Sequence, residues 1–102
     1  MPEAAKRARQ QDARLSRLYE IDKRLSEVPE LLEQAWEEWR EMIEYYETKW
    51  RHDLAELDGT PQGALGVLSE DGVWNEMGEF YETMKAIKES ATKIVAAYER
   101  NQ

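Results

Sequence analysis

The single histidine of the chain lies beside two carboxylates in a segment that predicts a short helix. His52 and Glu56 are four residues apart, and Asp53 adjoins the histidine. Groups at this spacing share one helix face and can share a metal ion. Carboxylate-bridged di-iron bundles use a Glu-x-x-His motif, however, and position 49 here is Lys49. We therefore expect solvated side chains at this place, with no metal ligands and no catalytic residue.

Ser69, Glu70 and Asp71 are a second polar group, at the start of an expected helix. A helix N-terminus can hold an anion, but two carboxylates would repel it. Capping accounts for all three residues, with Ser69 as N-cap and Leu68 and Val73 as an apolar staple. The chain has no cysteine, which excludes thiolate metal sites and thiol nucleophiles. We expect no cofactor and no enzymatic activity.

Glutamates recur at helical spacing in the first half of the chain and form a negative stripe. Its members are Glu30, Glu33, Glu37, Glu41 and Glu44. A general acid and base pair needs one raised pKa in a dry pocket, which a solvated stripe does not provide. One interpretation is a solvated outer face. The other is a docking surface for a basic partner, on which the row of carboxylates could imitate a row of phosphates.

The net charge of −8 is unevenly distributed along the chain. Residues 1–24 carry seven basic and four acidic groups, or +3, so the remaining residues carry −11. An acidic body repels phosphate backbones and anionic lipid, so we expect neither nucleic acid nor membrane as the main partner. The short basic arm can seek an acidic surface, including that of a second copy.

Two long runs of apolar residues follow the heptad pattern of packed helices. The first run is Leu18, Ile21, Leu25, Val28, Leu32, Ala35, Trp39, Met42 and Tyr46. The second is Met77, Phe80, Met84, Ile87, Ala91, Ile94 and Tyr98. Pro29 falls inside the first run without changing its phase, which predicts a bent helix, with Ser26 as an N-cap if the helix breaks.

These patterns predict an all-α fold in which residues 1–102 form one domain. Helices of about residues 4–46 and 70–99 form a long antiparallel hairpin of the coiled-coil kind, in which Trp39 pairs with Met77 and Leu18 with Tyr98. A short helix over about 48–57 and a loop over 59–66 lie between them. Residues 1–14 are the basic arm, which we expect to fray or to be helical only against a partner.

Large aromatic residues concentrate near the expected turn of the hairpin. A protein with two layers cannot hide so many rings, so we expect some of them to bind a partner. The candidate partner-binding residues are Trp36, Tyr45, Tyr46, Trp50 and Trp74. The apolar stripe is also wider than one hairpin covers, and the end near Leu18 and Tyr98 lies beyond the reach of the short helix. We therefore expect a homodimer.

A set of residues near the turn carries a family resemblance. It comprises Tyr45-Tyr46, Trp50, Asp53, Pro61 and Gly66-Val67-Leu68-Ser69-Glu70-Asp71. Over about residues 40–85 this pattern resembles a family of short bacterial proteins catalogued only as a domain of unknown function. The chain departs from the pattern where Glu47-Thr48-Lys49 fills a gap that usually holds a glycine and one more residue. The resemblance implies a small helical protein and no reaction.

Together these observations predict a non-enzymatic helical module for protein–protein interaction that self-associates and can also bind another protein. An acidic mimic that binds a basic, nucleic-acid-binding protein is one alternative. A secreted hairpin of the type VII class is another, although Asn75 and Glu76 follow Trp74 where that class has a Trp-x-Gly turn. The chain has no apolar run long enough for a membrane span or a signal peptide, so we expect a cytoplasmic protein.

Overall fold

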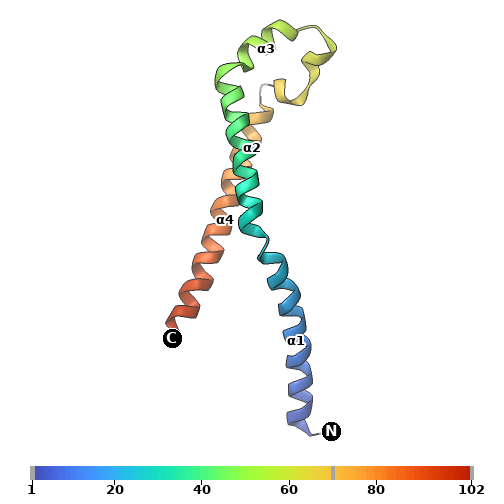
Figure 1. Cartoon of the computed structure of the whole chain (residues 1–102), viewed down its shortest axis with the longest axis vertical. Coiled ribbons are helices and arrows are strands. Elements are labelled where there is room, and N and C mark those ends of the chain that lie inside the picture. Colours follow the sequence, from blue (N-terminus) through green and yellow to red (C-terminus); the bar gives the residue numbers. More distant parts are fainter. Residues whose placement is uncertain (1, 70, 102) are drawn as a thin grey trace. The chain divides into compact units, whose positions relative to one another are not determined.

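A computed structural model describes residues 2–69 and 71–101 of the chain. These residues form helices, turns and bends and no strand, which confirms the all-α class (Figure 1). In chain order the elements are α1 (Glu3–Leu25), α2 (Val28–Thr48), α3 (Trp50–Leu57), the 3₁₀ turns η1 (Pro61–Ala64) and η2 (Gly66–Leu68), and α4 (Gly72–Arg100). None of the described helices is long and apolar enough to cross a bilayer.

The chain divides into two compact units, residues 1–47 and residues 48–102. The first unit holds α1 and nearly all of α2, and the second holds α3, the two 3₁₀ turns and α4. The antiparallel register of the long helices joins residues from both units, so it stays a prediction. The organisation as one domain stays a prediction too.

The first unit begins with a regular helix through the basic arm. Residues 3–14 lie within α1, so the arm is helical in this structure. Its Ala, Arg, Lys and Gln residues have high helix propensity, and they continue without interruption into the stretch that ends at Leu25. Fraying of the arm in the absence of a partner stays a prediction.

The bend that the sequence predicts at Pro29 is a two-residue turn between α1 and α2. Pro29 has no N–H for the carbonyl of Leu25, and its ring crowds that carbonyl, so α1 ends at Leu25. The amide of Glu27 donates to the Arg24 carbonyl at 3.3 Å, an i→i−3 hydrogen bond of the kind that closes a tighter 3₁₀ turn. Ser26 is not the N-cap of α2, because its hydroxyl donates backwards to the Lys23 carbonyl at 2.6 Å.

The short helix α3 ends in a turn that Gly59 and Thr60 define. Gly59 has a φ of 80°, which a residue with a side chain rarely adopts. The Thr60 hydroxyl donates to the Leu57 carbonyl at 2.6 Å and accepts from the amide of Gly63 at 3.3 Å. A Cβ on Gly63 would lie 2.5 Å from the Leu57 carbonyl oxygen, so only glycine fits there. These contacts hold η1 against α3.

The last helix begins later than its capping pattern predicts. The amide of Ser69 donates to the Gly66 carbonyl at 3.1 Å and closes η2, so Ser69 ends that turn and does not cap α4. Asp71 occupies the N-cap position without a side-chain hydrogen bond, and α4 starts at Gly72. The predicted role of Glu70 lies outside the described residues.

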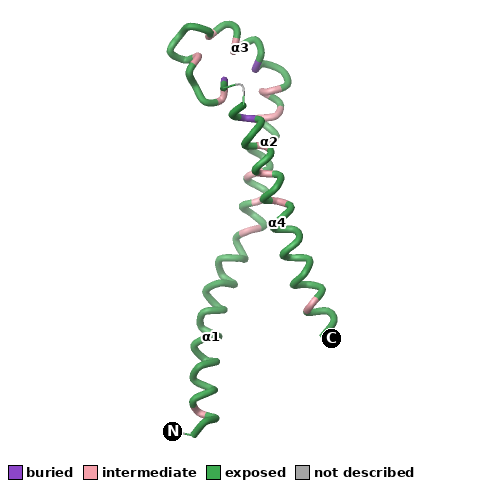
Figure 2. The backbone as a smooth tube through the Cα atoms, turned by 180° about the vertical axis from the view of Figure 1, so that it is seen from behind, coloured by how far each residue is buried: buried purple, intermediate pink, exposed green. Residues whose placement is uncertain are grey.

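Buried side chains are few among the described residues, and they lie in the second unit (Figure 2). Trp50 is 8% exposed, Leu68 4% and Val73 6%. The heptad residues of α2 and those of α4 as far as Met84 are half-buried. Those of α1 and of α4 beyond Met84 are exposed. Coverage of the apolar stripe thus falls toward both ends of the chain.

Replacing Pro29 with alanine should join α1 to α2. The variant gains an amide that can donate to the Leu25 carbonyl and loses the ring that crowds it. We expect slower amide hydrogen exchange at residues 26–28, measured by NMR. Gln34→Ala, an exposed change in the same helix, is the matched control. Equal exchange in the two variants would show that the proline does not cause the break.

Candidate functional site

The loop-bearing end of the second unit is organised around Trp50. Its indole N–H donates to the backbone carbonyl of Val67 at 2.8 Å, a bond that joins the start of α3 to η2 across 17 residues. A buried indole N–H needs such a partner, because leaving it unpaired costs free energy. The bond therefore fixes the returning loop against α3.

Leu68 and Val73 complete this small core on the side of α4. Both are buried, and η2 contacts both α3 and α4. The sequence predicted Leu68 and Val73 as an apolar staple across the start of the last helix. Leu68 is buried before this start and Val73 after it, although Ser69 does not cap the helix. The start of α4 is thereby held to the loop by apolar packing.

The five residues predicted to bind a partner differ in exposure. Trp50 is part of the core just described, which removes it from any docking surface. Tyr45 and Tyr46 in α2 are half-buried, and both make interactions within the molecule. Trp36 in the first unit and Trp74 in the second are exposed. Their gathering around one end of the molecule stays a prediction, as does their role in binding.

Trp74 borders a shallow groove on one face of α4. The groove is lined by Trp74, Asn75, Gly78, Glu79, Glu82 and Thr83. The Trp74 side chain is 66% exposed, and a Cβ on Gly78, one turn later, would meet no atom within 4 Å. An exposed indole next to open space is a suitable anchor for an apolar side chain of a partner.

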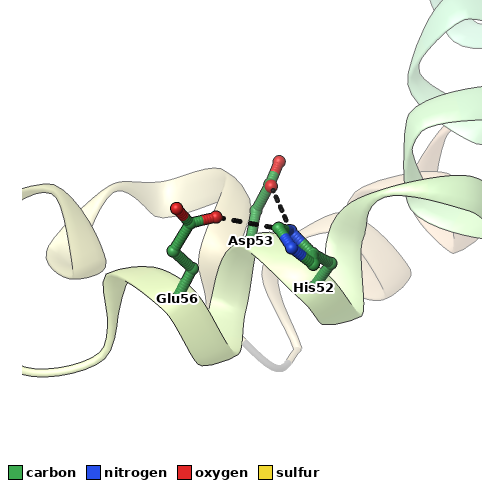
Figure 3. Close-up of side chains that lie close together, drawn as sticks. All are labelled: His52, Asp53 and Glu56. Carbon is green, nitrogen blue, oxygen red and sulfur yellow. Dashed lines mark hydrogen bonds and ion pairs between the residues drawn. The ribbon is translucent and has the colours of Figure 1, made fainter.

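His52, Asp53 and Glu56 do lie close together on α3 (Figure 3). The His52 Nδ1 atom is 3.3 Å from an Asp53 carboxylate oxygen and 3.4 Å from one of Glu56. Their potential ligand atoms all lie within 4.8 Å of one another, and His52 and Glu56 are exposed. Such a group can stabilise α3 by i,i+4 contact. All the potential metal ligands of this group come from the single helix α3, on a face that is open to water.

The acidic stripe and the basic arm occupy successive helices of the first unit. Glu30, Glu33, Glu37, Glu41 and Glu44 are all exposed on α2. The seven basic residues counted within residues 1–24 are all in α1, and they too are exposed. The uneven charge of the sequence is therefore displayed on two adjoining surfaces, one on each side of the Ser26–Glu27 turn.

Exposed apolar residues occur in each of the two units. In α1 they are Leu15, Leu18, Ile21 and Leu25, and in the last turns of α4 they are Ile94, Val95 and Tyr98. Leu25 is 59% exposed and Ile94 71%. Single exposed apolar residues are ordinary, whereas these residues recur at the spacing of a heptad pattern.

Two features of the structure were missed at the level of sequence. The partner of Trp50 is the backbone carbonyl of Val67, which no residue type reveals. The Lys85 ammonium lies 5.4 Å from the centre of the Tyr81 ring, an i,i+4 cation–π contact on α4.

Comparison with known proteins places this chain in a family. Residues 10–90 match the family described as Domain of unknown function (DUF4298), and the chain belongs to it. No curated protein and no solved structure matches significantly. The resemblance that the sequence suggested is therefore confirmed and covers most of the chain, including α2, α3 and both 3₁₀ turns.

Replacing Trp50 with phenylalanine should destabilise the second unit. The Val67 carbonyl would lose its donor and the smaller ring would leave a void, so we expect the free energy of unfolding to fall by about 1–3 kcal/mol. Denaturant titration followed by circular dichroism measures this change. Trp74→Phe is the matched control, and its exposed ring should cost less than about 0.5 kcal/mol. Equal losses would contradict the role given to the indole hydrogen bond.

Proposed function

We propose that this protein is a non-enzymatic helical interaction module that associates with a second copy of itself. One observation carries the proposal: the heptad residues of α1 are exposed, and so, in the other unit, are those at the end of α4. A helix with an apolar stripe gains most of its stability by packing that stripe against another surface. A second copy supplies such a surface in a four-helix arrangement.

The free energy at stake is large enough to drive association. Burying a fully exposed Leu or Ile side chain contributes about 1.5–3 kcal/mol. Leu15, Leu18, Ile21 and Leu25 are each close to half exposed or more, so covering them in two copies yields several kilocalories per mole. The residue content also favours binding over catalysis, because the chain has no cysteine and its one histidine is solvated.

Solution mass tests the proposal. The wild-type chain should sediment at twice the chain mass, and Leu18→Glu should raise the dissociation constant of the dimer at least about tenfold, because each copy loses an apolar contact and buries a charge. Ala13→Glu adds the same charge to α1 away from the stripe and should leave the dimer intact. A wild-type protein that stays at single-chain mass at high concentration would overturn the proposal.

A second candidate function is capture of a basic protein by the acidic face of α2. The observation that favours it is the exposure of all five glutamates of the stripe. Such binding depends on charge and weakens as salt screens it.

A lysine-rich peptide is a suitable probe of this second candidate. Its affinity should fall steeply with added salt, and Glu37→Gln with Glu41→Gln should weaken it severalfold at low salt. Glu76→Gln with Glu79→Gln, in α4, is the matched control with the same change in charge. Binding that is indifferent to salt, or equal in the two variants, would exclude the acidic stripe as the docking surface.

A further inference from the structure

The Ser26–Glu27 turn divides the first unit into two helices of almost equal length and opposite charge. α1 has 23 residues and α2 has 21. Seven basic and four acidic groups give α1 a charge of +3, whereas one basic and seven acidic groups give α2 a charge of −6. When two such segments lie antiparallel, the basic helix of each one lies along the acidic helix of the other.

The apolar stripe has the same symmetry about the turn. Leu25 and Val28 each lie next to the turn, on opposite sides of it. Ile21 and Leu32 are equally far from it, and so are Leu18 and Ala35. Laid antiparallel on a second copy, these three heptad positions of α1 therefore fall on apolar positions of α2, whereas Leu15 falls on Glu38.

We infer that two copies pair their α1–α2 segments antiparallel about a two-fold axis at the Ser26–Glu27 turn. α1 of each copy then lies along α2 of the other, and Leu18 packs against the partner's Ala35. An interface made of the same patch on both copies is the usual form of a symmetric dimer. This inference rests on the self-association proposed above and specifies its geometry.

Electrostatics select the antiparallel orientation over the parallel one. A parallel dimer would place two helices of charge +3 side by side and two of charge −6 side by side, which costs free energy in both pairs. The antiparallel register instead lays the helix of charge +3 in each copy along the helix of charge −6 in the other. Each exposed ion pair contributes little, so these charges set the orientation and the apolar stripe supplies the affinity.

The outer layers of this register also match. Beyond Leu18, the α1 positions that face the partner are Arg14, Gln11 and Arg7, and their counterparts on α2 are Trp39, Met42 and Tyr46. Long arginine stems can cover aromatic rings and place the guanidinium over the ring face. Long, flexible side chains of α1 thus meet large apolar residues of α2.

The apolar face of α2 is wide enough for this second neighbour. Leu31 and Trp36 are exposed on opposite flanks of the half-buried Leu32 and Ala35. A stripe of this width can contact two helices at once, as in a four-helix bundle. The apolar face of α2 can therefore contact α1 of a second copy and one further helix at the same time.

Distances between spin labels test the inference directly. Because the chain has no cysteine, Glu27→Cys and Gln10→Cys each give a dimer with one label per copy. Both positions are exposed, and circular dichroism checks that each variant keeps its helicity. Pulsed electron paramagnetic resonance should give a distance under about 20 Å between the two labels at residue 27, because this residue flanks the two-fold axis. The two labels at residue 10 should lie about 50 Å apart, because an α-helix rises about 1.5 Å per residue.

The other outcomes separate the inference from the proposed function. A dimer by mass with short distances at both residues would mean a parallel pair, and long distances at both would place the contact elsewhere. Either result overturns the antiparallel arrangement and leaves self-association standing. A monomer by mass, with no measurable distance between labels, overturns both.

Discussion

The apolar face of a helix has to be covered before the helix is stable in water, and this constraint governs the whole chain. Among the described residues, burial is achieved in the second unit, by Trp50 in α3, Leu68 in η2 and Val73 in α4. None of the residues of α1 is buried, and its heptad leucines are exposed to solvent. We propose that a second copy covers α1, and the charge pattern of the first unit supports this proposal.

The Trp50 hydrogen bond shows how a small protein builds one ordered end with little core. A single indole joins α3 to η2, and Leu68 and Val73 then hold η2 to the first turn of α4. The loop between them keeps its shape through the Thr60 bonds and the close approach of Gly63. Membership of a family without an assigned reaction is compatible with this design, because the ordered end presents an exposed Trp74 and no buried titratable residue among those described.

The sequence predicted the helices well because periodicity and propensity are local properties. The sequence patterns place the end of α2 and the bounds of α3 and α4 within about two residues of those observed. The helices α1 and α2 were predicted as one bent helix, and Pro29 marks the bend because its missing N–H acts within one turn. The start of α4 was misplaced because Ser69 closes η2, a competition that depends on the fold of the loop. Likewise, the burial of Trp50 depends on a carbonyl 17 residues away, so the aromatic candidates could be named from the sequence but not sorted into core and surface.

The central claim is that a second copy covers α1, and amide hydrogen exchange at different protein concentrations tests it most directly. Association orders and covers the backbone at an interface, so exchange there slows when the dimer is populated. The account predicts that protection of residues 15–25 rises with concentration, while protection around Trp50 and Leu68 stays constant because that core is internal to one chain. Exchange in α1 that is independent of concentration would contradict it.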